Sequence, residues 1–137
     1  MTQTILVTHN DRRRLGTMLE AMHAYGTERR EHLNALETVI EEAQGIDPAE
    51  VPHDVVTMNT TVVMRDEDNG EKEVYTIVYP ERADVSLNRI SVLAPIGTAV
   101  LGCRVGDVAE VDVPSGRRRI RIERIRYQPE SSEDYHL

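Results

Sequence analysis

The stretch Ile90-Ser-Val-Leu-Ala-Pro-Ile-Gly-Thr-Ala-Val-Leu-Gly102 joins a strand-like run to a short helical one. Residues 89–93 are rich in apolar and β-branched side chains, which predicts a strand. Pro95 is tolerated in the first turn of a helix and Gly102 suits the end of one, so one or two helical turns are predicted at 95–101. The stretch therefore indicates a domain that combines a sheet with a short helix.

The sequence on both sides has the pattern of further strands and tight turns. Strand-like runs, either dense in Val and Thr or alternating, occur at residues 55–65, 73–79, 108–113 and 118–127. Two turn sequences separate neighbouring runs, with Asn-Gly inside 66–70 and Pro114-Ser-Gly116 near the end. We expect an antiparallel sheet with one short helix.

The N-terminal part predicts two helices. Thr8 and Asp11 have the spacing of a helix start, and the second helix is expected to begin near Thr27 and to stop at Gly45 as its C-terminal cap. Apolar side chains recur at spacings of three and four at Leu15, Met18, Met22 and Tyr25, and again at Leu33, Leu36, Ile40 and Ala43. A connection of a few residues around Gly26 makes the helices antiparallel, in a hairpin roughly 20 to 25 Å long.

The chain is therefore expected to have an α+β fold in three parts. Residues 1–47 form the helical hairpin, 48–130 the sheet domain and 131–137 an acidic tail, with the prolines of 46–52 ending the helical part. The tail is expected to be loose from Gln128 onward.

Composition limits the classes of function. The chain has 137 residues, 39% of them apolar and 29% charged, with 16 basic against 24 acidic side chains, which suits one core. A net charge of -8 disfavours nucleic acid as a direct partner. The chain has no Phe and no Trp, which disfavours an aromatic-lined pocket for a small organic ligand. No apolar run of membrane-spanning length and no signal-like N-terminus occur, so we expect a cytoplasmic monomer that does not bind membranes.

No catalytic, metal or cofactor site is predicted. The histidines are not spaced from Cys or from acidic residues as the ligands of a metal site would be. They are His9, His23, His32, His53 and His136. Cys103 is interpreted as a small buried hydrophobic residue. Glu28 and Glu31 either stabilise a helix start through its dipole or help a partner bind a divalent metal, a role that Arg29 and Arg30 oppose.

A basic run covers 117–126, with six arginines and one glutamate. The arginines either form a docking face or line a solvated strand face. The sequence leaves both interpretations open.

The stretch 90–102 resembles the C-terminal domain of the bacterial Gre transcript-cleavage factors, together with Arg104-Val-Gly-Asp107 and Val113-Pro-Ser-Gly116. The chain resembles one branch of that family more closely still, the regulators of nucleoside diphosphate kinase. In this branch the finger, which is the N-terminal helical hairpin, is shortened. The segments that carry this second resemblance are Val51-Pro-His-Asp-Val-Val-Thr-Met-Asn59, Val78-Tyr-Pro80, Tyr127-Gln-Pro-Glu130 and Asp134-Tyr-His-Leu137.

The resemblance implies an FKBP-like C-terminal domain that binds RNA polymerase at the rim of its secondary channel. It places the binding segment at Leu93, Ala94, Pro95, Ile96 and Gly97. Gre factors have polar residues before this proline, whereas Leu93 and Ala94 stand here. We expect residues 95–97 to lie on an exposed edge.

The finger tip departs from the Gre pattern. It is expected to comprise Tyr25, Gly26, Thr27, Glu28 and Glu31. Gre factors carry an acidic pair at the end of a finger about twice as long, and Glu28 and Glu31 match that pair poorly. The sequence predicts polymerase binding without transcript cleavage.

The sequence leaves three candidate functions for this chain. The first is a non-catalytic regulator that binds RNA polymerase and competes with Gre-type factors. The second is a protein-binding module that acts on nucleoside diphosphate kinase or another metabolic enzyme. The third, a peptidyl-prolyl isomerase, rests on fold alone and lacks the aromatic residues that a proline slot needs.

Overall fold

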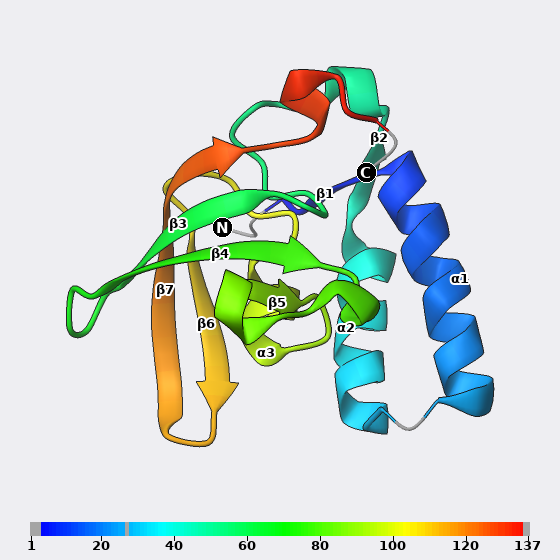
Figure 1. Ribbon diagram of the computed structural model, residues 1–137, viewed down its shortest axis with the longest axis horizontal. Helices are drawn as coiled ribbons and strands as arrows, with labels where there is room; N and C mark the ends of the chain where they lie inside the picture. The colour runs from blue at the N-terminus through cyan, green and yellow to red at the C-terminus, as the bar shows by residue number, and fades with distance from the viewer. Residues whose placement is uncertain (1–3, 27, 136–137) are drawn as a thin grey trace.

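The computed structural model describes residues 4–26 and 28–135 and has the expected α+β architecture (Figure 1). A hairpin of α1 (His9–Tyr25) and α2 (Arg30–Glu42) lies beside a curled sheet. The sheet has the order β5-β4-β3-β7-β6. Its strands are β3 (Thr61–Asp66), β4 (Lys72–Val78), β5 (Arg89–Ser91), β6 (Val108–Val113) and β7 (Gly116–Tyr127). All neighbours are antiparallel except β4 and β5, which are parallel.

The two helices meet along the predicted leucine seam. Leu15 and Leu19 of α1 and Leu33 and Leu36 of α2 are all buried. Tyr25 is the exception, because 91% of its surface is exposed at the end of α1. The Thr8 hydroxyl accepts a hydrogen bond from the Asp11 amide at 3.0 Å, so α1 begins where the sequence predicts.

The predicted ends of the second helix are wrong. It begins at Arg30 rather than near Thr27, which lies outside the described residues, and it ends at Glu42 rather than at Gly45. The Arg12 side chain donates to the carbonyls of Ile40 and Ala43, so the last turn is capped from the neighbouring helix.

Gly45 belongs to β2 (Gln44–Ile46), which pairs in parallel with β1 (Leu6–Thr8). A Cβ at Gly45 would lie 2.8 Å from the Cε1 of His9 and from the Nη1 of Arg12. Gly45 therefore lies against the His9 and Arg12 side chains of α1 and does not end a helix.

The predicted strand at 55–65 is shorter than expected. Residues 57–60 form a tight turn in which the Thr57 amide donates to the Thr60 hydroxyl at 3.0 Å. Asn59 has a φ of 65°, which no strand accommodates. The strand therefore starts at Thr61. The short helix α3 (Pro95–Val100) and the tight turn between β3 and β4 lie where the sequence predicts.

One continuous core joins the hairpin to the sheet. Its largest fully buried side chains come from both parts of the chain and include Leu15, Leu36, Met58, Ile77, Leu101 and Ile122. None of the described helices is both long enough and apolar enough to span a bilayer.

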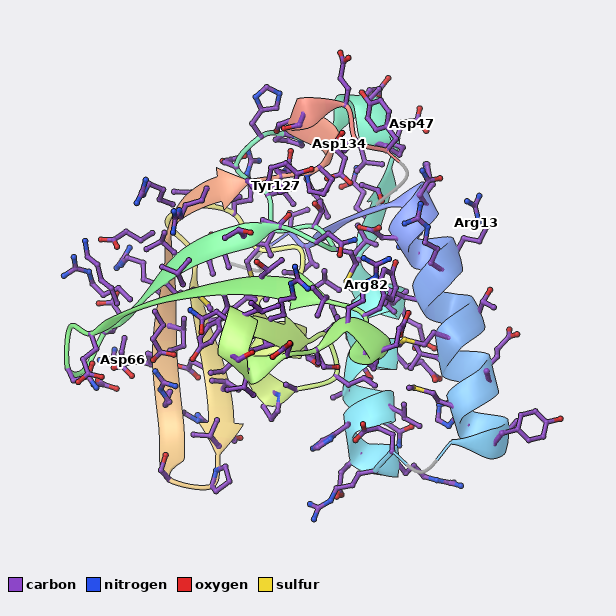
Figure 2. All side chains as sticks on the ribbon, in the orientation of Figure 1. Arg13, Asp47, Asp66, Arg82, Tyr127 and Asp134 are labelled. Atoms are coloured by element: carbon purple, nitrogen blue, oxygen red, sulfur yellow. The ribbon has the colours of Figure 1, made fainter. Side chains whose placement is uncertain are left out.

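The C-terminal segment is not loose at its start, contrary to expectation. Gln128 is buried and its amide donates to the carbonyls of Val55 at 2.7 Å and Pro52 at 2.9 Å. The Thr57 hydroxyl donates to the Glu130 carboxylate at 2.5 Å. The hydroxyl of Tyr127 donates to Asp134, which lies next to it in Figure 2, and this bond raises the pKa of Tyr127 to about 12.

Candidate partner-binding site

The segment 93–97 is a rigid turn that leads from β5 into α3. The Ser91 hydroxyl accepts a hydrogen bond from the Leu93 amide, and the Ser91 carbonyl accepts one from the Ala94 amide, both at 3.0 Å. The Thr98 hydroxyl donates to the Val92 carbonyl at 2.5 Å. These bonds fix the direction in which α3 leaves the sheet.

The predicted binding residues differ in exposure. Pro95 is exposed at the first turn of α3, and Ala94 and Ile96 are half-buried. Leu93 is buried in the core, as is Gly97. The expectation that residues 95–97 all lie on an exposed edge is therefore wrong for Gly97.

Gly97 has a packing role. A Cβ at this position would lie 2.4 Å from the Ser91 carbonyl oxygen, a distance that side chains do not tolerate. The glycine thus lets α3 pack directly against the end of β5. Gly97 is therefore a buried packing residue that helps to position Pro95 at the surface.

Pro95 borders a groove of about 270 Å³ between α2, α3 and the edge strand β6. The walls include His32, Val39, Leu93, Pro95, Glu110 and Asp112. The sequence pointed to Leu93 and Pro95 of this groove but not to the contribution of α2, because no local pattern brings α2 to β6.

The predicted finger tip ends in an exposed aromatic ring. Tyr25 is almost fully exposed, and Gly26 ends α1 with its amide donating to the Met22 carbonyl at 2.9 Å. Thr27 lies outside the described residues. The end of α1 and the start of α2 lie at the same end of the molecule as the turn between β6 and β7, and α2 runs along the sheet domain (Figure 1).

Both tip carboxylates face cationic or potentially cationic side chains. The Glu28 carboxylate is 3.0 Å from Nδ1 of His32, and the Glu31 carboxylate is 3.8 Å from Arg29. Within 4–26 and 28–135, no three His, Cys, Asp or Glu side chains are grouped so that they could hold a metal ion. Each tip carboxylate thus has a basic side chain as its neighbour.

The basic run on β7 is mostly paired with nearby carboxylates. Arg117 lies 3.0 Å from Asp112, Arg119 lies 2.9 Å from Asp68, and Arg121 contacts Glu67. Arg118 contacts both Asp66, at 3.0 Å, and Glu73. A solvated strand face, rather than a cationic docking face, describes this part of β7.

Cys103 has the predicted core position. It is buried, its thiol donates to the Ala99 carbonyl at 3.4 Å, and burial together with the Asp107 charge raises its pKa to about 12. A thiol held protonated in this way is a poor nucleophile.

Comparison with known proteins places this architecture in a family. Residues 51–127 match the family model described as "Transcription elongation factor, GreA/GreB, C-term". The "Regulator of nucleoside diphosphate kinase" of Escherichia coli strain K12 is 39% identical over 98% of this chain and 97% of its own length. The "Transcription elongation factor GreA" of Mesorhizobium japonicum is 41% identical over 69% of this chain and 60% of its own length.

The fold agrees with these sequence matches. A solved GreA/GreB elongation factor from Nitrosomonas europaea superposes with a TM-score of 0.74 at 38% identity, covering 90% of this chain and all of that one. Its likeness extends across the hairpin as well as the sheet domain. The chain belongs to the GreA/GreB family of transcription elongation factors.

Proposed function

We propose that the chain is a non-catalytic regulator that binds RNA polymerase near its secondary channel and competes there with Gre-type factors. The observation that carries the proposal is the contrast between the two candidate regions. The segment to which the Gre resemblance points lies on a rigid turn with Pro95 exposed, whereas each tip carboxylate has a basic side chain as its neighbour. The partner comes from the elongation-factor names of the relatives.

The hairpin geometry supports binding without cleavage. The α1 helix has 17 residues, so it is about 25 Å long. A carboxylate that helps to hold Mg²⁺ must bring net negative charge to the metal. Arg29 beside Glu31 reduces that charge, and the Glu28 carboxylate is already hydrogen-bonded to the His32 ring. We propose that the tip occupies the channel entrance without supplying metal ligands.

Pro95→Asp tests the binding segment. In a titration of fluorescently labelled chain with core RNA polymerase, this variant is expected to bind at least tenfold more weakly, about 1.4 kcal/mol, because a charge replaces an apolar contact. Pro114→Asp is the matched control, since Pro114 is exposed in the turn after β6. If the folded Pro95→Asp variant binds the polymerase as tightly as the parent, the segment is not part of the binding site.

The name of one relative suggests an alternative partner. The E. coli relative is named as a regulator of nucleoside diphosphate kinase, which makes direct contact with that kinase the alternative. Co-purification of tagged chain from a lysate separates the two. Recovery of kinase without polymerase subunits would favour the alternative.

A further inference from the structure

A separate pocket of about 680 Å³ lies between α1 and the segment that follows β4. Its walls include Arg13, Arg14, Met18, Asn59, Tyr79 and Arg82. Figure 2 labels Arg13 on α1 and Arg82 in the short 3-10 helix Pro80–Arg82. None of these residues belongs to the groove beside Pro95 or to the finger tip.

The pocket is cationic in a chain with a net charge of -8. Three arginines line it against one carboxylate, Glu81. Arg13 and Arg82 make no ion pair with any described residue, and Arg14 donates only to the Tyr135 carbonyl, at 3.3 Å. By contrast, the arginines of β7 from Arg117 to Arg121 are paired with carboxylates.

Tyr79 gives a second, independent indication of a ligand. Its hydroxyl is buried and has no hydrogen-bond partner in the part of the chain that is described. Burial raises the pKa of Tyr79 and the charges of Asp11 and Glu81 add to this, whereas the nearby Arg14 guanidinium opposes the rise. An unpaired buried hydroxyl is costly, so a ligand that hydrogen-bonds to it would bind favourably.

We infer that this pocket binds a small organic phosphate, such as a mononucleotide. Arginine forks match the oxygens of phosphate, and three of them suit a group that carries two or more negative charges. The Met18 side chain and the Tyr79 ring provide apolar surface for the organic part, and the volume is in the range of small-molecule sites. The inference does not depend on polymerase binding.

Calorimetric titration of the whole chain with AMP, ADP and ATP tests the inference. Binding is expected to tighten from AMP to ATP, because each added phosphate brings negative charge to the arginines. Adenosine lacks the charge and inorganic phosphate lacks the organic part, so each is expected to bind at least tenfold more weakly than ATP. No heat with any nucleotide at millimolar concentration, or equal binding of adenosine and ATP, would overturn the inference.

Two variants and a control identify the residues. Arg13→Gln with Arg82→Gln is expected to weaken ATP binding at least tenfold, while Arg89→Gln, at an exposed arginine of β5 without an ion pair to the described residues, leaves it unchanged. Tyr79→Phe is expected to weaken ATP binding about fivefold and to raise the stability of the ligand-free chain, since it removes an unpaired hydroxyl.

The signs of these effects separate a ligand site from a structural role. If Tyr79→Phe lowers stability and leaves ATP binding unchanged, the hydroxyl does not face a ligand and the assignment is wrong. Binding of a short single-stranded RNA through the same arginines, without binding of mononucleotides, would also overturn it. Polymerase binding measured on the same variants reports on the proposed function separately.

Discussion

Asp11 joins the hairpin to the sheet domain through a buried carboxylate. The side chain is 2% exposed and accepts a hydrogen bond from the Met58 amide at 3.1 Å, across the boundary between the two parts. Burial raises the pKa of Asp11 to about 7, the Glu130 charge adds to the rise, and the Met58 amide, Arg14 and Thr8 oppose it.

This pKa makes stability depend on pH. Between about pH 4 and pH 7 the folded chain keeps a proton on Asp11 that the unfolded chain has released, so stability falls as pH rises through that interval. Asp11→Asn keeps an oxygen for the Met58 amide and removes the charge. The variant is expected to exceed the parent in stability at pH 8, by up to about 4 kcal/mol, and to equal it near pH 4.

Urea unfolding at pH 4.5, 6 and 8 measures the difference. Asp47→Asn is the control, because Asp47 is exposed on the surface 3.7 Å from His9 and is labelled in Figure 2. A constant difference between Asp11→Asn and the parent from pH 4.5 to pH 8 contradicts the assignment of the raised pKa.

Gly97 and Gly16 allow a matched test of whether close packing against a neighbouring backbone requires glycine. A Cβ at Gly97 meets the Ser91 carbonyl at 2.4 Å, whereas a Cβ at Gly16 in α1 meets nothing within 4 Å. Gly97→Ala is expected to destabilise the chain by about 1 to 3 kcal/mol through overpacking. Gly16→Ala is expected to stabilise it by about 0.5 to 1 kcal/mol through helix propensity. Thermal unfolding of both variants gives the signs, and equal shifts would refute the packing role.

At the scale of elements, β7 is tied to the turn between β3 and β4 by ion pairs of unequal burial. Arg118 is 24% exposed in its side chain, and its partner Asp66 is 5% exposed. Asp66 also accepts hydrogen bonds from the amides of Asp68 and Asn69, at 2.8 and 3.2 Å, which lowers its pKa together with Arg118. The carboxylate therefore organises the turn and the strand at once.

Arg118→Gln is expected to lower the free energy of unfolding by about 2 kcal/mol, because a partly buried carboxylate loses its charged donor. Arg117→Gln is the control on the same strand, where both partners are more than half exposed and the loss is expected to stay below about 1 kcal/mol. Urea unfolding compares them. Equal losses would mean that burial does not set the strength of these pairs.

In the molecule as a whole, the hairpin and the sheet domain share one large buried hydrophobic cluster. The leucines of α1 and α2 belong to the same buried cluster as the sheet residues, and α2 runs along the domain rather than away from it (Figure 1). α2 thereby packs beside α3, the helix that begins at Pro95.

This arrangement predicts inhibition without cleavage. In a backtracked elongation complex, the chain is expected to shorten no transcript and, in excess, to reduce cleavage by a Gre factor at least tenfold. The double change Glu28→Gln and Glu31→Gln is expected to inhibit as well as the parent, because the carboxylates are already paired. Gel analysis of labelled transcripts measures both effects. Cleavage by the parent that the double variant loses would show that the tip is catalytic.

Local signals in the sequence were enough to predict the elements that form within one helix or one turn. The three-and-four spacing of leucines predicted the hairpin, the Asn-Gly turn predicted the pairing of β3 with β4, and Pro95 predicted the start of α3. Each of these signals acts within one helix or one turn, so periodicity and backbone preference are enough to read it. The resemblance of 90–102 to the Gre factors, on which the proposed binding segment rests, was recognisable for the same reason, since its residues are contiguous.

Contacts between residues that are far apart in the sequence follow from the packing of the folded chain and could not be predicted from local patterns. Arg12 caps α2 from 31 positions away at Ala43, Asp11 reaches Met58 across 47, and Arg118 reaches Asp66 across 52. The same holds for the arginine pocket, whose walls come from α1 and from the segment after β4. Whether a charge is paired, buried or free depends on which elements pack together, and packing of this kind leaves no local pattern in the sequence.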